Sequence, residues 1–183
     1  EGRITRYQRD VSRLIFLNAN ENPEMKAIEP AKLRVNFFKG NDKSKWYCGV
    51  PASTALLYKR LYNKIDLKVY GMERQIEYDW IVKPGGNPGD IQFQYKNVKE
   101  IRIDEQGNLL IKTEFGELIH KRPVSYQLIH NEARGQKINS RKYVNVEFKR
   151  INEFAYGFEV GDYDRSKELI IDPAVMTYST YLG

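Results

Sequence analysis

The stretch that decides the fold is residues 65–82, IDLKVYGMERQIEYDWIV. Apolar and polar residues alternate on both sides of Gly71–Arg74, which is typical of two β-strands joined by a turn. With Gly71–Arg74 as the loop, the cross-strand pairs on one face are apolar: Val69–Ile76, Leu67–Tyr78 and Ile65–Trp80. We expect this face to be buried, because a slip of one residue would mix apolar and polar side chains.

The same register places Asp66 directly opposite Asp79 on the other face. Like charges in that position are destabilising, so we expect an offset from Lys68, Lys83, backbone N–H groups of the Pro-Gly turn or a bound cation. Together with Glu77, these carboxylates form an acidic cluster. It could hold calcium, which needs about six to eight oxygen ligands, or act as a glycosidase carboxylate pair. The alternative is a solvated polar face contacted by lysines.

Outward from this hairpin, period-two alternation recurs along the chain, at 33–37, 91–95, 101–103, 109–111, 124–128, 144–148 and 154–160. Turn signals separate these runs at Pro84–Gly89, Asp104–Asn108 and Glu114–Glu117. The pattern predicts an all-β fold, an antiparallel β-sandwich of about ten to twelve strands, with a flattened β-barrel as the alternative. Ala52–Tyr62 fits a helix or a strand, and polar Asn131–Ser140 is expected to be a mobile loop.

Composition excludes several classes of protein. The chain of 183 residues has one cysteine, so it has no internal disulfide framework and no cysteine-based zinc site. No apolar run approaches the roughly 18 residues of a membrane span. The formal charge of +6 is spread along the chain without a nucleic-acid-binding motif, so we expect no nucleic-acid partner.

Aromatic side chains offer a second candidate site. A platform that stacks sugar rings could be built from Trp46, Tyr47, Tyr58, Tyr62 and Tyr70. The alternative is that these rings pack in the core or at sheet edges. Cys48 with His120 or His130 could form a nucleophile and base, but neither histidine lies in a catalytic motif, and we expect no enzymatic activity.

The end of the chain, LIIDPAVMTYSTYLG at residues 169–183, has the form of a junction leading into β-propeller repeats. Further matching pieces precede it in order, among them Gly40-Asn41-Asp42 with Ser44-Lys45-Trp46, Tyr70-Gly71, Glu77-Tyr78-Asp79 and Gly161-Asp162-Tyr163-Asp164. From about Val11 to Gly183 the chain resembles the β-rich domain N-terminal to SBBP-type β-propeller repeats in large secreted bacterial proteins.

The resemblance implies a non-enzymatic structural or interaction module that works outside the cell or at the cell surface. On this basis residues 1–174 are the sandwich domain, and residues 175–183 resemble the first strand of a following propeller repeat. The chain is short at its N-terminal side relative to the family, which would expose a sheet edge and favour assembly by β-strand addition. The expected partners are other protein domains or copies of the chain, with glycans, and possible calcium, as the alternative.

Overall fold

The computed structural model describes residues 11–72, 75–133, 136–173 and 176–180. These residues confirm the predicted all-β class, since they form fifteen strands and two short 3₁₀ turns without any α-helix. The strands make three antiparallel sheets, none of which closes into a barrel, so the sandwich prediction is confirmed over the flattened barrel. The described part of the chain also contains no helix with the length and hydropathy that a bilayer crossing requires.

Three sheets, named A, B and C, surround one core. Sheet A has the order β1 (Arg13–Phe16), β6 (Gln92–Lys96), β13 (Ala155–Val160), β12 (Val146–Arg150). Sheet B has the order β11 (Gln136–Val144), β10 (Val124–Ala133), β14 (Leu169–Asp172), β5 (Gln75–Val82), β4 (Ile65–Met72), β3 (Tyr47–Tyr62), β2 (Glu24–Phe37). Sheet C has the order β15 (Met176–Thr180), β9 (Gly116–His120), β8 (Leu109–Lys112), β7 (Glu100–Ile103). The predicted turns at Asp104–Asn108 and Glu114–Glu117 are confirmed as the connections within sheet C.

The core lies where the inner faces of the three sheets meet. Trp80 of β5 is fully buried there, with the ring of Phe16 edge-on at 5.3 Å between centroids. Phe93 of sheet A and Ile111 of sheet C are buried in the same cluster. Trp80 and Phe93 belong to alternating runs, and their neighbours along the strand are only partly buried. Alternation therefore identified the inner faces.

The predicted register of the β4–β5 hairpin is wrong by two residues. Leu67 lies opposite Trp80 and Lys68 lies opposite Asp79, because the strands continue to Met72 and Gln75. A two-residue slip preserves both faces, so burial alone does not decide between the two registers. The length of the turn decides, and its residues 73–74 lie outside the described part.

Because of this shift, Asp66 and Asp79 are not opposite each other. Asp66 is paired with Ile81, and the register of β14 against β5, continued by one residue, places Asp172 opposite Asp79. The like-charge pair expected within the hairpin is therefore found between β5 and β14. Strand β14 comes from about ninety residues further along the chain, and local sequence patterns do not indicate such a neighbour.

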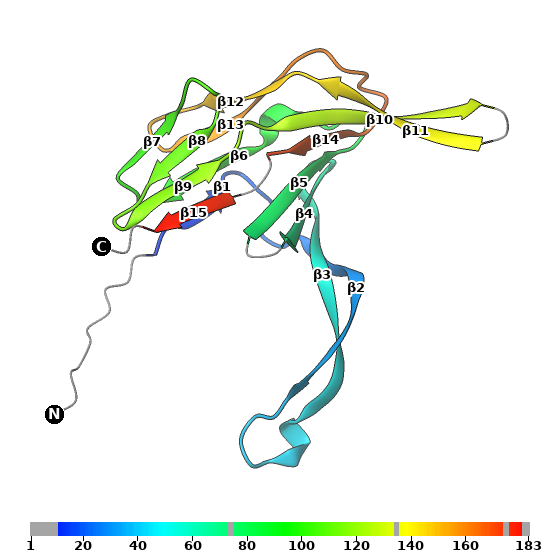
Figure 1. The fold of residues 1–183 in the computed structure, drawn as a ribbon, viewed down its shortest axis with the longest axis vertical. Coiled ribbons are helices and arrows are strands. Elements are labelled where there is room, and N and C mark those ends of the chain that lie inside the picture. Colours follow the sequence, from blue (N-terminus) through cyan, green and yellow to red (C-terminus); the bar gives the residue numbers. More distant parts are fainter. Residues whose placement is uncertain (1–10, 73–74, 134–135, 174–175, 181–183) are drawn as a thin grey trace.

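Two hairpins leave the body in different directions, β2–β3 and β10–β11 (Figure 1). Residues 52–62, which fitted a helix or a strand, belong to β3. The expected loop at Asn131–Ser140 is wrong, since β10 and β11 pair from Ser125–Val144 out to Ala133–Gln136. Backbone hydrogen bonds extend this ribbon whatever the side chains, so a polar sequence does not prevent it.

Candidate interaction surface

The β2–β3 hairpin is an arm that continues beyond the body of sheet B. β3 pairs with β4 between Ala55 and Tyr62, whereas its pairing with β2 continues outward to Tyr47 opposite Phe37. Beyond Ala55 the arm is a two-stranded ribbon, and it forms the long projection in Figure 1. An isolated two-stranded ribbon is marginally stable in water, so this region needs stabilising contacts of its own.

Hydrogen bonds across the strands close the base of the arm head, defined here as residues 34–50. The amide of Gly49 donates to Oδ1 of Asn36 at 2.7 Å, and Nη1 of Arg34 donates to the carbonyl of Gly49 at 2.8 Å. The φ of Gly49 is 64°, a left-handed conformation in which glycine carries no steric cost. These bonds hold the strands together where the register shifts between Val35 and Phe37.

The turn of the arm head is fixed by polar contacts around Asp42. Its Oδ1 accepts hydrogen bonds from the amide of Ser44 at 3.0 Å and from the hydroxyl of Ser44 at 2.7 Å. Lys45 forms an ion pair with its Oδ2 at 3.4 Å. Nε1 of Trp46 donates to the carbonyl of Gly40 at 3.0 Å. The arm head thus has a defined shape without a buried core of its own.

Aromatic side chains of the arm head face solvent. Phe37, Phe38 and Tyr47 are 54%, 61% and 65% exposed, and the ring of Phe38 lies edge-on to Trp46 at 5.0 Å. Large apolar side chains exposed together are characteristic of interaction sites, in which aromatic residues are enriched. The arrangement is suited to insertion of rigid rings into a partner.

The net charge is concentrated in the same region, so the expectation that it is spread along the chain is wrong. Residues 31–50 contain five basic residues and one acidic residue, so they contribute +4 of the formal +6 of the chain. The basic residues are Lys32, Arg34, Lys39, Lys43 and Lys45. Nζ of Lys43 lies 5.9 Å from the ring of Trp46, which places charge beside the aromatic cluster. A basic region with exposed aromatic rings is complementary to an acidic surface with apolar pockets.

The five aromatic residues predicted as a sugar platform lie in three separate places. Trp46 and Tyr47 are in the arm head, at the start of β3. Tyr58 packs against the core and Tyr62 is buried in it, with its hydroxyl donating to the carbonyl of Gln92 at 2.8 Å. Tyr70 covers Lys68, whose Nζ is 4.8 Å from the ring centroid. Only Trp46 and Tyr47 remain together as possible contacts for a ligand.

The predicted carboxylate cluster is also divided. Asp66 is 4% exposed; Lys83 Nζ contacts its Oδ2 at 2.6 Å, and the amide of Arg60 donates to its Oδ1 at 2.7 Å. Asp66 therefore holds the backbone of β3 at Arg60. Within residues 11–72, 75–133, 136–173 and 176–180, no three His, Cys, Asp or Glu side chains are placed to hold a metal ion. Calcium at Asp66, Glu77 and Asp79 stays a prediction without support from this geometry.

Glu77 and Asp79 lie on the outer face of sheet B. The hydroxyl of Tyr70 donates to Asp79 Oδ1 at 3.2 Å, and Lys68 is the cross-strand neighbour of Asp79. Burial, followed by the charge of Asp172, raises the pKa of Asp79 from 3.8 to about 6. The hydrogen bond from Tyr70 and the charge of Lys68 act in the opposite direction. Asp79 is thus a carboxyl that loses its charge in mildly acidic solution.

His120 is buried and serves as a bridge between the sheets. It is 1% exposed; its Nδ1 lies 2.9 Å from the hydroxyl of Tyr78 in sheet B, and its Nε2 bonds the hydroxyl of Tyr95 in sheet A. Burial lowers the pKa of His120 from 6.5 to about 4, so it is neutral at pH 7. Cys48 is exposed on the arm, so these two residues form no nucleophile–base pair. The side chain of His130 lies outside the described part.

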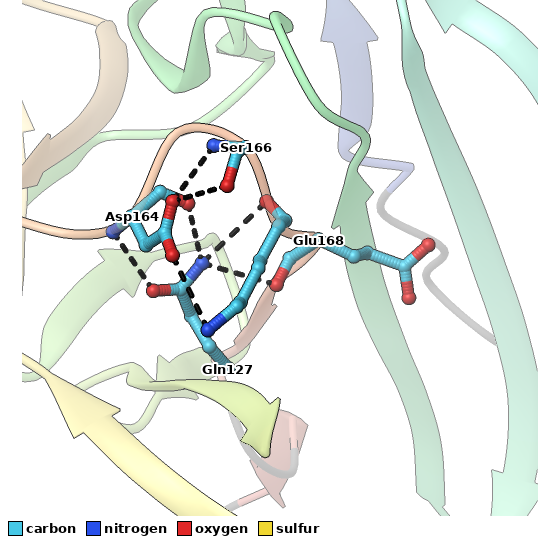
Figure 2. Close-up of polar contacts among 5 residues, drawn as sticks. Gln127, Asp164, Ser166 and Glu168 are labelled. Carbon is cyan, nitrogen blue, oxygen red and sulfur yellow. Dashed lines mark hydrogen bonds and ion pairs between the residues drawn. The ribbon is translucent and has the colours of Figure 1, made fainter. Parts of the chain in front are cut away.

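Gln127 of β10 holds the loop between β13 and β14, a role that the sequence did not indicate. Its Nε2 donates to the carbonyls of Asp164 at 2.8 Å and Glu168 at 3.3 Å, and its Oε1 accepts the amide of Asp164 at 2.9 Å (Figure 2). Asp164 in turn accepts from the amide and hydroxyl of Ser166. Figure 2 shows the carboxylate of Glu168 pointing away from this amide. The network fixes the loop between β13 and β14.

The chain belongs to the family described as "Domain of unknown function (DUF7948)", whose model matches residues 2–174. No curated protein and no solved structure matches the chain. The description of the family names no activity, so the arm head and the surfaces of the body are the guides to function.

Proposed function

We propose that this domain is a non-enzymatic interaction module that works outside the cell or at the cell surface and binds another protein domain through its arm head. The observation that carries the proposal is the set of solvent-facing rings of Phe37, Phe38 and Tyr47 on a head held rigid by polar contacts. A rigid head loses little conformational entropy on binding, so more of the contact energy becomes affinity.

The chemistry of the arm head indicates the kind of partner. Aromatic residues and arginine supply most of the binding energy in protein interfaces when they fill pockets. The surplus of lysine and arginine at residues 31–50 would meet acidic side chains at the rim of such a pocket. The partner is therefore a folded protein with an apolar pocket and an acidic rim. A domain that follows this one in the same protein, such as the propeller that the sequence resemblance implies, fits this description as well as a second copy does.

Side-chain contact is favoured over β-strand addition on this arm. β2 is the edge strand of sheet B, but its ladder is irregular between Pro30 and Arg34, and proline lacks the N–H that an added strand would need. Charged residues along β2 also disfavour edge pairing. Assembly by strand addition remains a prediction for the other sheet edges.

A photo-crosslinking experiment tests the proposal. The photoreactive residue p-benzoylphenylalanine replaces Tyr47 or, as the matched control, Tyr143 of β11, which is also a tyrosine and is 64% exposed. The full-length protein is irradiated in its native cells, and crosslinked proteins are identified by mass spectrometry. We expect a discrete crosslinked protein or domain from position 47 that is absent from position 143. The same products from both positions, or none from position 47, would overturn the proposal.

A second variant separates binding from folding. Phe37→Ser, Phe38→Ser and Tyr47→Ser together remove the exposed rings while leaving the polar contacts of Asn36, Gly49 and Asp42 in place. We expect affinity for the crosslinked partner to fall at least 100-fold, with the melting temperature unchanged. Wild-type affinity in this variant would show that the rings do not form the interface.

A further inference from the structure

A polar hollow lies at the opposite end of β3 from the arm head. It has a volume of about 430 Å³ and lies at the Asn63–Lys64 turn between β3 and β4, against the segments around Asn18 and Gln92. This volume is within the range of small-molecule sites, about 300–1,000 Å³. Neither the proposed function nor the family description assigns it a role, and an inference about it is independent of the arm.

The walls of the hollow are held in place by hydrogen bonds that need no ligand. The amide of Asn20 donates to the carbonyl of Leu61 at 2.8 Å, and its side chain Nδ2 donates to the carbonyl of Arg60 at 3.2 Å. The amide of Leu17 donates to the carbonyl of Gln92 at 2.8 Å, and the hydroxyl of Tyr62 donates to the same carbonyl. A site with walls fixed in advance binds at a lower entropic cost.

Three residues that line the hollow have an unusual backbone conformation. Asn18, Arg60 and Lys64 have φ values of 55°, 52° and 58°, and they are three of the five non-glycine residues with positive φ in the described part. Glycine adopts this conformation freely and asparagine tolerates it, whereas a long side chain raises its energy. Strained backbone conformations are frequent at ligand sites, where the surrounding structure holds them in place.

The side chain of Asp66 holds the strained backbone at Arg60 in place. The buried carboxylate of Asp66 accepts the amide of Arg60 at 2.7 Å, and Asp66 is itself fixed by Lys83 at 2.6 Å. The pairing of β3 with β4 is irregular between Tyr58 and Tyr62, so this contact lies at a bulge. Bulges redirect side chains next to binding sites. Asp66 is thus a positioning residue that presents Arg60 at the hollow.

The functional groups of the lining select the class of ligand. The side-chain amides of Asn18, Asn63 and Gln92 can each donate and accept, which suits sugar hydroxyls that also do both. Arg60 and Lys64 bring two positive charges, and no ion pair of either is found among the described residues. The charge of Arg60 also acts on the carboxylate of Glu24, and the ammonium of Lys64 lies over Gly85, beside the hollow. The acidic residue of the lining, Asp90, accepts a hydrogen bond from Asn87 at 2.8 Å. We propose that the hollow binds a saccharide that carries a carboxylate, with Arg60 on the carboxylate and the amides on the hydroxyls. The long side chain of Lys64 turns from Gly85 to join Arg60 on the carboxylate.

Nuclear magnetic resonance titration tests this directly. The probes are digalacturonate, a hyaluronan tetrasaccharide and 3′-sialyllactose, with lactose as the neutral match and inorganic phosphate as a plain anion. We expect at least one acidic saccharide to shift the amide signals of Asn63 and Gln92 at a concentration at least tenfold below that needed by lactose or phosphate. Failure of all three acidic saccharides would overturn the proposal. Phosphate binding as tightly as the acidic saccharides would also overturn it, because the hollow would then bind anions without recognising sugar hydroxyl groups.

The backbone conformation supplies variants that should stay folded. Arg60→Gly and Lys64→Gly remove both cations while placing glycine where it fits best. We expect the double variant to lose at least tenfold in affinity for the acidic saccharide and to melt no lower than the wild type. Glu29→Gly is the matched control, since Glu29 also has a positive φ of 56° but does not line the hollow. Retained affinity in the double variant, or an equal loss in the control, would contradict the assigned roles.

Discussion

The body of the domain buries aromatic side chains, whereas the arm head exposes them to solvent. In the body, Trp80 is fully buried among apolar neighbours, whereas in the arm head Phe38 is 61% exposed. The body is stabilised by burial of apolar area, and the arm head by hydrogen bonds of Asn36, Asp42 and Trp46. Because stability and exposed rings lie in different regions, the arm head can change for binding without affecting the core.

The largest expected effect is a substitution in the body. Trp80→Ala should lower the free energy of unfolding by about 3–5 kcal/mol, because it opens a cavity where three sheets meet. Trp46→Ala, the matched change in the arm head, should lower it by less than about 1 kcal/mol. Urea denaturation followed by circular dichroism measures both values. Equal losses would mean that arm and body unfold as one cooperative unit, contrary to the comparison.

The next largest expected effect is a loss of folding stability at acidic pH. The folded pKa of His120, about 4, is below its unfolded value of 6.5, so the unfolded chain takes up the proton first. The stability that neutral His120 gives is complete above pH 6.5 and falls as the pH drops from 6.5 towards 4, by a total on the order of 3 kcal/mol. Chemical denaturation between pH 5 and 7 measures how the free energy of unfolding changes with pH. An imidazole signal of His120 that titrates near pH 6.5 would disprove the assignment.

The titration of Asp79 should change folding stability in the opposite direction to that of His120 as the pH falls. Its folded pKa of about 6 lies above the unfolded value of 3.8, so protonation below pH 6 favours the folded state. Asp79→Asn should therefore stabilise the protein at pH 7, with a difference that disappears near pH 4. The difference in pH dependence between the wild type and this variant measures Asp79, and the dependence left in the variant contains the contribution of His120.

A smaller effect is expected where the arm joins the body. Asp66→Ala removes the acceptor of the Arg60 amide and should cost about 1–3 kcal/mol. Asp66→Asn keeps an oxygen acceptor and should cost less. Thermal melting of the two variants compares them, and hydrogen exchange at Arg60 shows whether the loss is local. Equal losses would mean that the charge pairing with Lys83 matters more than the backbone contact.

The sequence was informative wherever the answer depended on local alternation. The inner faces at Leu67 and Trp80, and the turns at Asp104–Asn108 and Glu114–Glu117, follow from period two and turn residues. The register of β4 against β5 did not follow, because a two-residue slip leaves the same side chains on each face.

The arm head was missed for a different reason. Alternation at Leu33–Phe37 predicted a half-buried strand, and a repeating pattern does not reveal that no second layer covers it. The signals available were the adjacent Phe37 and Phe38, which break the alternation, and the surplus of basic residues from 31 to 50. The hollow was also beyond local patterns, because it joins segments around residues 18, 62 and 92.

The position of β14 has a consequence for how the chain acquires its fold during synthesis. β14 lies between β5 and β10 in the middle of sheet B, yet the ribosome makes it after both of them. Until residues 169–172 emerge, β5 and β10 have open edges towards each other and no partner between them. Such edges attract other nascent chains, and long-range pairings form slowly. The edge of β5 therefore lacks its neighbour while about ninety further residues are made, and we expect the nascent domain to be prone to aggregation until β14 is complete.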